Sequence, residues 1–162
     1  MRGRFVIFCG IPGSGKSTLA RIVARKLSNS IHIQTDAVRS MLSHPNFSGE
    51  ESKFVYDGCM AVAKEALREG YTVLLDGTFM REDYRQQARD KLARYSSRVD
   101  VVHVACDLET ALRRNSSRRV SIPPDRLRSI YERFEVPRRA LRIDSTRLRP
   151  SDAAARVAAA LS

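Results

Sequence analysis

The sequence lacks the features that mark membrane proteins and cysteine-ligated metal sites. No apolar run approaches the roughly 20 residues that a membrane-spanning helix needs, and the amino-terminal apolar stretch is too short for a cleaved secretion signal. The three cysteines, Cys9, Cys59 and Cys106, are widely spaced, and neither a Cys-x-x-Cys pair nor a histidine cluster accompanies them. The sequence therefore predicts a cytoplasmic protein without membrane contact, disulfide or metal-binding cysteine.

Acidic residues are scarce relative to basic ones. The 162 residues include 29 Lys plus Arg and 18 Asp plus Glu, a formal net charge of +11. The planar guanidinium of arginine binds phosphate oxygens in pairs, and strongly basic small proteins tend to bind polyanions. Nucleotide bias in a genome also enriches arginine, so the charge favours a nucleic-acid partner without establishing one.

The segment CGIPGSGKST, residues 9–18, joins a buried apolar run to a helical pattern. It contains Gly-x4-Gly-Lys-Ser, whose glycines let backbone N–H groups approach a polyphosphate closely. We expect Lys16 to lie near the β and γ oxygens and the Ser17 hydroxyl to bind Mg²⁺. An ordinary glycine-rich turn is the alternative, but the complete motif predicts a site for ATP or another nucleoside triphosphate with Mg²⁺. The expected nucleotide-binding residues of this loop are Gly10, Ile11, Pro12, Gly13, Ser14, Gly15, Lys16, Ser17 and Thr18.

Strand patterns alternate with helical patterns along the chain. Strands are expected at 4–9, 30–35, 71–77, 99–106 and 140–145, and helices at 16–28, 36–42, 50–69, 83–95, 108–115, 124–134 and 152–161. This alternation predicts one α/β domain over residues 1–162, a three-layer sandwich around a mainly parallel five-stranded sheet. Ligands of such sheets bind at the carboxyl ends of the strands, so the side chains that follow each strand are the candidates for chemistry.

Two aspartates follow predicted strands. Asp36 follows the second strand, and Arg39 lies three residues later, on the same face of a helix that starts here. Asp36 could accept the proton of an attacking hydroxyl while Arg39 holds the acceptor; a helix cap with a solvated partner is the alternative. Asp76 follows the third strand, where it would lie near the metal or the acceptor, or else cap a turn with Gly77.

Four arginines, Arg113, Arg114, Arg118 and Arg119, crowd the span before a Pro-Pro pair. Cations at this density repel one another unless an anion lies between them. We therefore expect a lid over about residues 113–124 whose arginines stabilise charge on nucleotide phosphates and exclude water. A solvated basic helix face is the alternative for some of the four.

The segment RRNSSRRVSIPPDRLRSIY resembles the lid of the polynucleotide 5′-hydroxyl kinases of bacteriophage type. In that family an Arg-Asn-Ser-x-Arg run is followed by proline and then by Leu-Arg-Ser-x-Tyr. GIPGSGKST, TDAVRSML and LLDGTF resemble the family's phosphate loop, Asp-x-x-Arg motif and post-strand aspartate, in the same order. The resemblance covers roughly residues 4–131 and implies a P-loop kinase-type fold.

The resemblance also implies a role for each matching residue. Lys16 and Ser17 would contact the nucleotide and the metal, Asp36 would be the general base, and Arg39 would hold the acceptor. Asp76 would be an active-site carboxylate. The lid arginines that bind the nucleotide would be Arg114 and Arg118, with Arg118 also assisting catalysis.

Three functions remain open on the sequence alone. The first is an ATP-dependent kinase acting on the 5′-hydroxyl end of DNA or RNA. The second is a kinase for a small hydroxylated metabolite, an antibiotic or an aminoacyl-tRNA, but residues 36–53 lack the aromatic and carboxylate density of a closed sugar pocket. The third is a non-catalytic nucleotide-binding module, which would not need a base and lid arginines. The sequence predicts neither a DNA or RNA preference nor an oligomeric state.

Overall fold

The computed structural model describes residues 3–161, so the first two residues and the last residue of the predicted domain 1–162 lie outside the described residues. Five strands form one sheet in the order β2-β3-β1-β4-β5, and all four pairings are parallel. The strands are β1 Phe5–Cys9, β2 Ser30–Gln34, β3 Thr72–Asp76, β4 Val99–Ala105 and β5 Leu141–Asp144. The predicted α/β sandwich is confirmed, with a described sheet that is wholly parallel.

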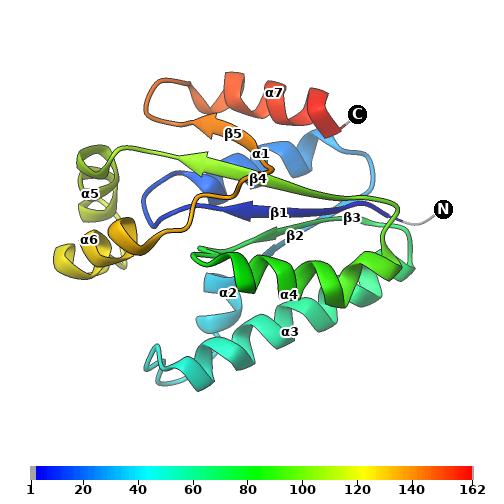
Figure 1. Ribbon diagram of the computed structural model, residues 1–162, viewed down its shortest axis with the longest axis horizontal. Helices are drawn as coiled ribbons and strands as arrows, with labels where there is room; N and C mark the ends of the chain where they lie inside the picture. The colour runs from blue at the N-terminus through cyan, green and yellow to red at the C-terminus, as the bar shows by residue number, and fades with distance from the viewer. Residues whose placement is uncertain (1–2, 162) are drawn as a thin grey trace.

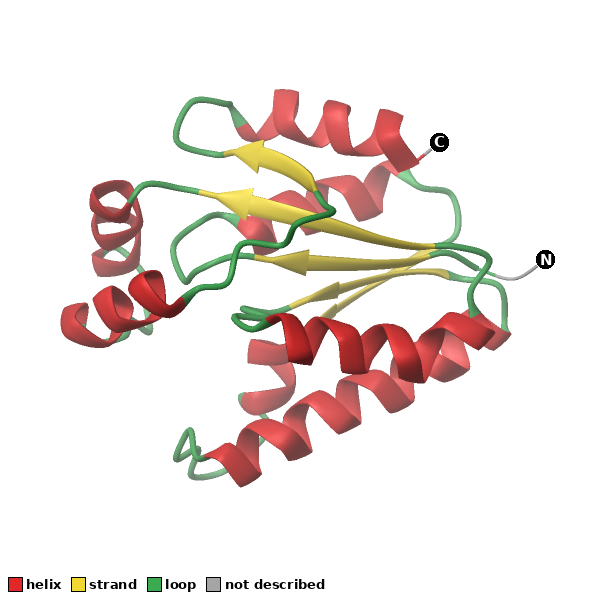
Figure 2. Cartoon of the chain, viewed as in Figure 1, coloured by secondary structure: helices red, strands yellow, loops and turns green. Residues whose placement is uncertain are grey.

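Helices cover both faces of the sheet (Figure 1). The α-helices are α1 Lys16–Lys26, α2 Thr35–Arg39, α3 Gly49–Arg68, α4 Glu82–Leu92, α5 Leu108–Ser116, α6 Pro124–Arg133 and α7 Pro150–Leu161. α1 and α7 lie on one face, and α3 and α4 lie on the other. The arrows of the strands all point toward α5 and α6, so the carboxyl ends of the strands meet at the edge where these helices lie (Figure 2).

The central strand β1 explains why the sheet is buried on both sides. Its five residues are fully buried, and their side chains alternate between the two faces. Phe5 and Ile7 pack toward α3 and α4, whereas Val6 and Phe8 pack toward α1 and α7. A parallel sheet needs such two-sided cover, because the crossover connections place helices on its faces. The continuous apolar run before the phosphate loop is the sequence signature of this burial.

The connection from β4 to β5 leaves the sheet instead of covering it. α5, α6 and the loop between them, residues 108–133, form a helical hairpin that we call the lid, with a small core of its own around Ile11, Ala111 and Leu127. Buried Asn115 closes the hairpin: its Nδ2 donates to the Ile122 carbonyl at 2.8 Å, and its Oδ1 accepts from the Ile122 N–H at 3.1 Å. The predicted lid span, 113–124, lies within this longer helical hairpin.

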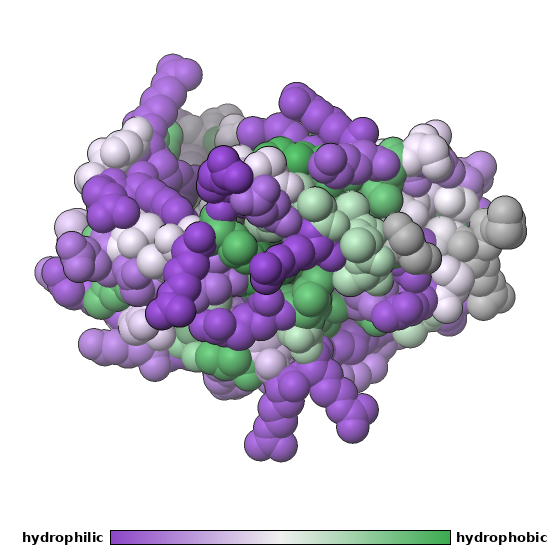
Figure 3. Space-filling view, turned by 90° about the horizontal axis from the view of Figure 1, so that it is seen from above, coloured by the Kyte–Doolittle hydropathy of each residue, from purple (hydrophilic) through white to green (hydrophobic). Residues whose placement is uncertain are grey.

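Hydrophilic side chains cover most of the face shown in Figure 3, and apolar ones gather near its middle. Within residues 3–161, none of the helices combines the length and the apolar character that crossing a membrane requires.

His103 on β4 is a buried imidazole that packs against the chain segment leaving the lid. Its ring stacks on Phe134, with centroids 5.2 Å apart and planes inclined by 18°. Burial, together with the charges of Arg142 and Arg85, lowers the pKa of His103 from 6.5 to about 4. The folded protein therefore holds His103 neutral over a pH range in which the unfolded chain protonates it.

This difference predicts a stability loss in mild acid. Below pH 6.5 the unfolded chain takes up a proton that the folded chain excludes until about pH 4, so the free energy of unfolding should fall by about 2 kcal/mol between pH 7 and pH 5. Urea unfolding across this range measures the loss. In His103→Phe, which can still stack on Phe134, the slope should vanish, whereas in exposed His44→Ala it should remain. Equal slopes in wild type and His103→Phe would contradict the neutral buried imidazole.

Candidate active site

The phosphate loop lies between β1 and α1 and packs directly on the lid. Gly13 and Gly15 have φ angles of +83° and +85°, a backbone conformation that favours glycine. A Cβ on Gly13 would lie 2.4 Å from the carbonyl oxygen of Ala111 on α5. The glycines therefore give the loop its shape and also let the lid helix approach it.

The amino terminus of α1 is suited to bind an anion. The first turn of this helix contains no acidic residue, so the positive end of its dipole is not neutralised. Lys16 is buried, and its Nζ lies 3.5 Å from the Ile11 carbonyl, which folds the cation back over the loop. The Ser14 hydroxyl is buried and has no hydrogen-bond partner among the described residues. These groups fit the phosphates of a nucleotide, and Ser17 would be a ligand of Mg²⁺, which neutralises phosphate charge when bound.

One small cleft collects the side chains that follow the first three strands. It is lined by Lys16, Ser17, Gln34, Thr35, Asp36, Asp76, Gly77 and Thr78. This placement agrees with the expectation that Asp36 and Asp76 lie beside the phosphate loop. Their chemical roles are predictions. Gln34, Thr35 and Thr78 were not predicted as site residues, although each lies at the end of a strand or just beyond it.

Asp76 contacts His32 on β2, and His32 in turn contacts Gln34 on the same strand. Its side chain is 2% exposed, and Oδ2 lies 3.2 Å from Nε2 of His32. The Gln34 Nε2 lies 3.5 Å from Nδ1 of the same imidazole. A buried carboxylate needs such partners, because an unpaired one costs several kcal/mol of desolvation. The contact with His32 orients the Asp76 carboxylate.

Asp36 is the most exposed of the predicted site residues in the cleft. It lies in the first turn of α2, its side chain is 68% exposed, and Nη2 of Arg118 on the lid lies 3.8 Å from its Oδ2. A solvent-exposed ion pair of this kind contributes about 1 kcal/mol or less to stability. Asp36 is therefore accessible to an acceptor, and Arg118 can leave it at low cost.

Arg39 is not among the residues that line the cleft, and its predicted role at the acceptor stays a prediction. Its side chain is only 12% exposed, because it is ion-paired with Glu51 and donates to the Ser52 hydroxyl at 3.2 Å. Glu51 also accepts the N–H groups of Asn46 and Phe47, at 2.6 and 3.1 Å. These backbone bonds, together with Arg39, lower the pKa of the Glu51 carboxyl.

The sequence signal for this arrangement is the capping box at the start of α3. Ser48 caps the helix by accepting the N–H of Glu51, and the Ser-x-x-Glu spacing places the Glu51 carboxylate back over the preceding loop. Sequence reasoning did not use this signal. Because of it, Arg39 is already neutralised, so an acceptor phosphate would have to compete with Glu51 for its guanidinium.

Phe47 joins this loop to the lid. The guanidinium carbons of Arg39 and of Arg126 on α6 each lie 4.9 Å from the centroid of the Phe47 ring. Phe47 itself has a φ of +56°, which is unusual for a bulky residue. Such cation–π contacts are worth about 0.5–1 kcal/mol at exposed sites. The lid thus contacts the segment 36–47 at two points, Arg118 with Asp36 and Arg126 with Phe47.

The two predicted lid arginines lie in different surroundings. Arg114 donates to the hydroxyl and the carbonyl of Ser145, at 3.0 and 2.9 Å, and Ser145 in turn donates to the Ser14 carbonyl at 2.6 Å. Arg114 therefore braces the back of the phosphate loop, close to Gly15. Ser145, which directly follows β5, was missed as a candidate although the strand-end rule points to it.

Comparisons with known proteins agree on the type of fold. A family model, AAA_33, described as AAA domain, matches residues 5–142. An L-seryl-tRNA(Sec) kinase of Methanococcus maripaludis is 26% identical over 136 residues, which cover 82% of this chain and 52% of that protein. The chain thus spans about half the length of this relative.

Two solved structures show the same fold at low sequence identity. An unliganded sugar kinase from Janibacter sp. HTCC2649 has a TM-score of 0.78 at 21% identity, with 98% of this chain and 94% of that chain covered. A chain of the Pnkp1/Rnl/Hen1 RNA repair complex has a TM-score of 0.72 at 20% identity, with 82% and 44% covered.

Proposed function

Because the chain belongs to the AAA_33 family of P-loop kinases, we propose that it transfers the γ-phosphate of ATP to the 5′-hydroxyl end of a polynucleotide, DNA or RNA. The observation that carries this proposal is the exposure of Asp36. Asp36, the proposed base, is 68% exposed and lines the cleft. An enclosed small-molecule site would bury most of its ligand's surface. A solvent-exposed base can reach the terminal hydroxyl of a large acceptor while the rest of that acceptor remains outside the cleft.

The cations around Asp36 support the same acceptor. Arg118 lies beside the carboxylate, and Arg39 and Arg126 flank the Phe47 ring on the adjoining loop. Guanidinium groups next to an apolar ring match the alternating phosphates and bases of a nucleic-acid strand. Together with the net charge of +11, this surface favours a polyanion over a neutral sugar.

Each residue then has a defined task in the transfer. Asp36 orients the terminal hydroxyl and accepts its proton, and Lys16 neutralises charge on the phosphate oxygens of ATP. Arg118 moves from Asp36 to the phosphates when nucleotide and acceptor are bound, because its ion pair with Asp36 is weak and solvated. Asp76, held by His32, supplies the second carboxylate of the cleft.

A second candidate function follows from the 26% identity to the seryl-tRNA kinase. In that case the acceptor hydroxyl would be that of an amino acid esterified to tRNA. Such a substrate is also a polyanion, so the basic surface does not separate it from a 5′-hydroxyl end. The two candidates differ in the reacting hydroxyl, which product analysis can identify.

Salt dependence separates a polynucleotide from a small neutral acceptor. Each phosphate that contacts a cation releases counterions, so the KM for a 5′-hydroxyl oligonucleotide should rise with salt, with a log–log slope of roughly 0.7 per contact. Arg126→Ala, which removes the exposed arginine beside Phe47, should raise this KM and reduce the slope by about one contact. Arg68→Ala, an exposed arginine paired with Glu65 at the far end of α3, is the matched control. A flat wild-type series would favour a small neutral acceptor.

A further inference from the structure

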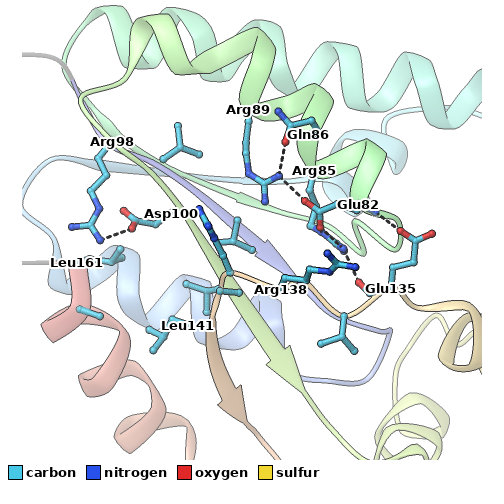
Figure 4. A pocket seen from close by; sticks show the side chains of 17 residues that line it. Glu82, Arg85, Gln86, Arg89, Arg98, Asp100, Glu135, Arg138, Leu141 and Leu161 are labelled. Atoms are coloured by element: carbon cyan, nitrogen blue, oxygen red, sulfur yellow. Dashed lines mark hydrogen bonds and ion pairs between the residues drawn. The ribbon is translucent and has the colours of Figure 1, made fainter.

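A second hollow, which we call the groove, lies over a part of the sheet that no helix covers (Figure 4). The groove encloses about 1050 Å³ between α4, the first half of β4, the start of β5, the end of α7 and the segment 134–140, which we call the strap. Val99, Val101 and Leu141 are among its apolar lining residues. It exists because α5 and α6 pack beyond the strand ends and place no helix over this part of the sheet.

Arginine dominates the polar lining of the groove. Five arginines, Arg85, Arg89, Arg98, Arg138 and Arg139, face three carboxylates, Glu82, Asp100 and Glu135. All three carboxylates are already engaged: Glu82 pairs with Arg85 and Arg89, and Asp100 with Arg98, while Glu135 accepts the N–H of Glu82 at 2.8 Å.

Two cations of the groove have no such partner. Within residues 3–161, no carboxylate forms an ion pair with Arg138 or Arg139, and both side chains are exposed. Figure 4 shows Arg138 beside Arg85 and Glu135, on the strap side of the groove. Like-charged neighbours over an apolar floor are stabilised when an anion binds between them. The groove is therefore complementary to an anionic ligand that also has apolar surface.

The lid helix α6 connects this groove to the segment 36–47 beside the cleft. Arg126 in its first turn contacts Phe47, and Arg133 is its last residue. Seven residues separate these arginines, so they share one face of the helix, about 10 Å apart. The strap begins directly after α6, and its Glu135 and Arg138 line the groove. Exposed arginines thus run from Asp36 to the groove.

We propose that this groove binds the sugar–phosphate backbone of the nucleic-acid strand behind its 5′ end. The proposal rests on the proposed function, because it assigns a place to the part of the acceptor that does not react. Arg138 and Arg139 contact backbone phosphates, and the apolar lining residues Val99 and Val101 contact sugars or bases. At a spacing of about 3.4 Å per stacked nucleotide, the 10 Å along α6 correspond to about three nucleotides. Only longer strands reach the groove.

The test compares a trinucleotide with an oligomer of about 20 nucleotides. The variant is Arg138→Glu with Arg139→Glu, and the matched control is Arg21→Glu with Arg25→Glu, two exposed arginines of α1 on the opposite face of the sheet. Both doubles change the net charge equally. We expect the groove variant to raise the KM for the long oligomer at least tenfold and to lower its salt slope by about 1.4, for two lost contacts. The KM for the trinucleotide should change less than twofold.

The outcomes separate this proposal from the function on which it rests. Equal effects of the two doubles on the long oligomer, or equal effects of the groove variant on both lengths, would overturn the groove assignment while oligonucleotides are still phosphorylated. If no oligonucleotide is phosphorylated, the proposed function fails, and fluorescence anisotropy with the same labelled oligomers tests the groove by itself. Displacement of the oligomer by poly-L-glutamate at equal charge, lost in the groove variant alone, would reassign the groove to an acidic polypeptide.

Discussion

Asp36→Asn should bind ATP normally and transfer its phosphate about 10² to 10⁴ times more slowly than wild type. The amide keeps the shape of the side chain and removes its ability to accept a proton. Because the side chain is 68% exposed and, within residues 3–161, its only ion pair is the loose one with Arg118, its replacement should not disturb the fold. Nucleotide affinity measured by titration, and kcat at saturating acceptor, separate the two effects.

A matched control distinguishes a base from a helix cap. Asp152 lies in the first turn of α7, as Asp36 does in that of α2, and is not among the residues that line the cleft. If Asp36 only stabilises its helix, then Asp36→Asn and Asp152→Asn should both cost about 1 kcal/mol or less of stability and leave kcat unchanged. That shared behaviour would remove Asp36 from the chemistry.

Gly13→Ala should weaken ATP binding by roughly 100-fold. The new methyl would lie 2.4 Å from the Ala111 carbonyl oxygen, and the residue would have to keep a φ of +83°. A strained backbone of this kind costs about 1–3 kcal/mol, and the clash forces either the loop or α5 to shift. Because the loop N–H groups must converge on the phosphates, that shift should appear as lost nucleotide affinity, measured by titration with a fluorescent ATP analogue.

Gly58→Ala provides the comparison. Gly58 lies within α3, and nothing would lie within 4 Å of its added Cβ. The same chemical change should therefore leave ATP affinity unchanged and raise the free energy of unfolding by about 1 kcal/mol, since alanine favours helix. Unchanged ATP affinity in Gly13→Ala would mean that the loop does not bind the phosphates in the conformation described.

The elements of the fold were predictable from the sequence, because buried strands and helices have characteristic patterns of apolar residues. All five strands were placed to within about a residue, since β1, β3 and β4 are apolar runs that the sheet buries on both faces. Helix ends were less accurate: α1 was expected to reach residue 28 and ends at Lys26. Propensity changes little over one turn, so the end of a helix depends on tertiary packing.

Side-chain partners distant in sequence were not predictable in the same way. The positions of Asp36 and Asp76 follow from the strand-end rule, whereas Arg39 is held by Glu51 and Arg114 by Ser145, 31 residues away. No periodicity encodes such pairs. They depend on how the loop 43–48 folds back and on where β5 ends beside the phosphate loop, which only the assembled structure shows.

Transfer of labelled phosphate from ATP most directly tests whether the protein phosphorylates 5′-hydroxyl ends. Matched DNA and RNA oligonucleotides with a 5′-hydroxyl or a 5′-phosphate are the acceptors, with a panel of small alcohols and seryl-tRNA as competitors. We expect label on the 5′ end of the hydroxyl-bearing oligonucleotides, none on those already phosphorylated, and little inhibition by the small alcohols. Label on a small alcohol or on the serine of seryl-tRNA, with none on any 5′-hydroxyl end, would contradict the proposed polynucleotide kinase activity.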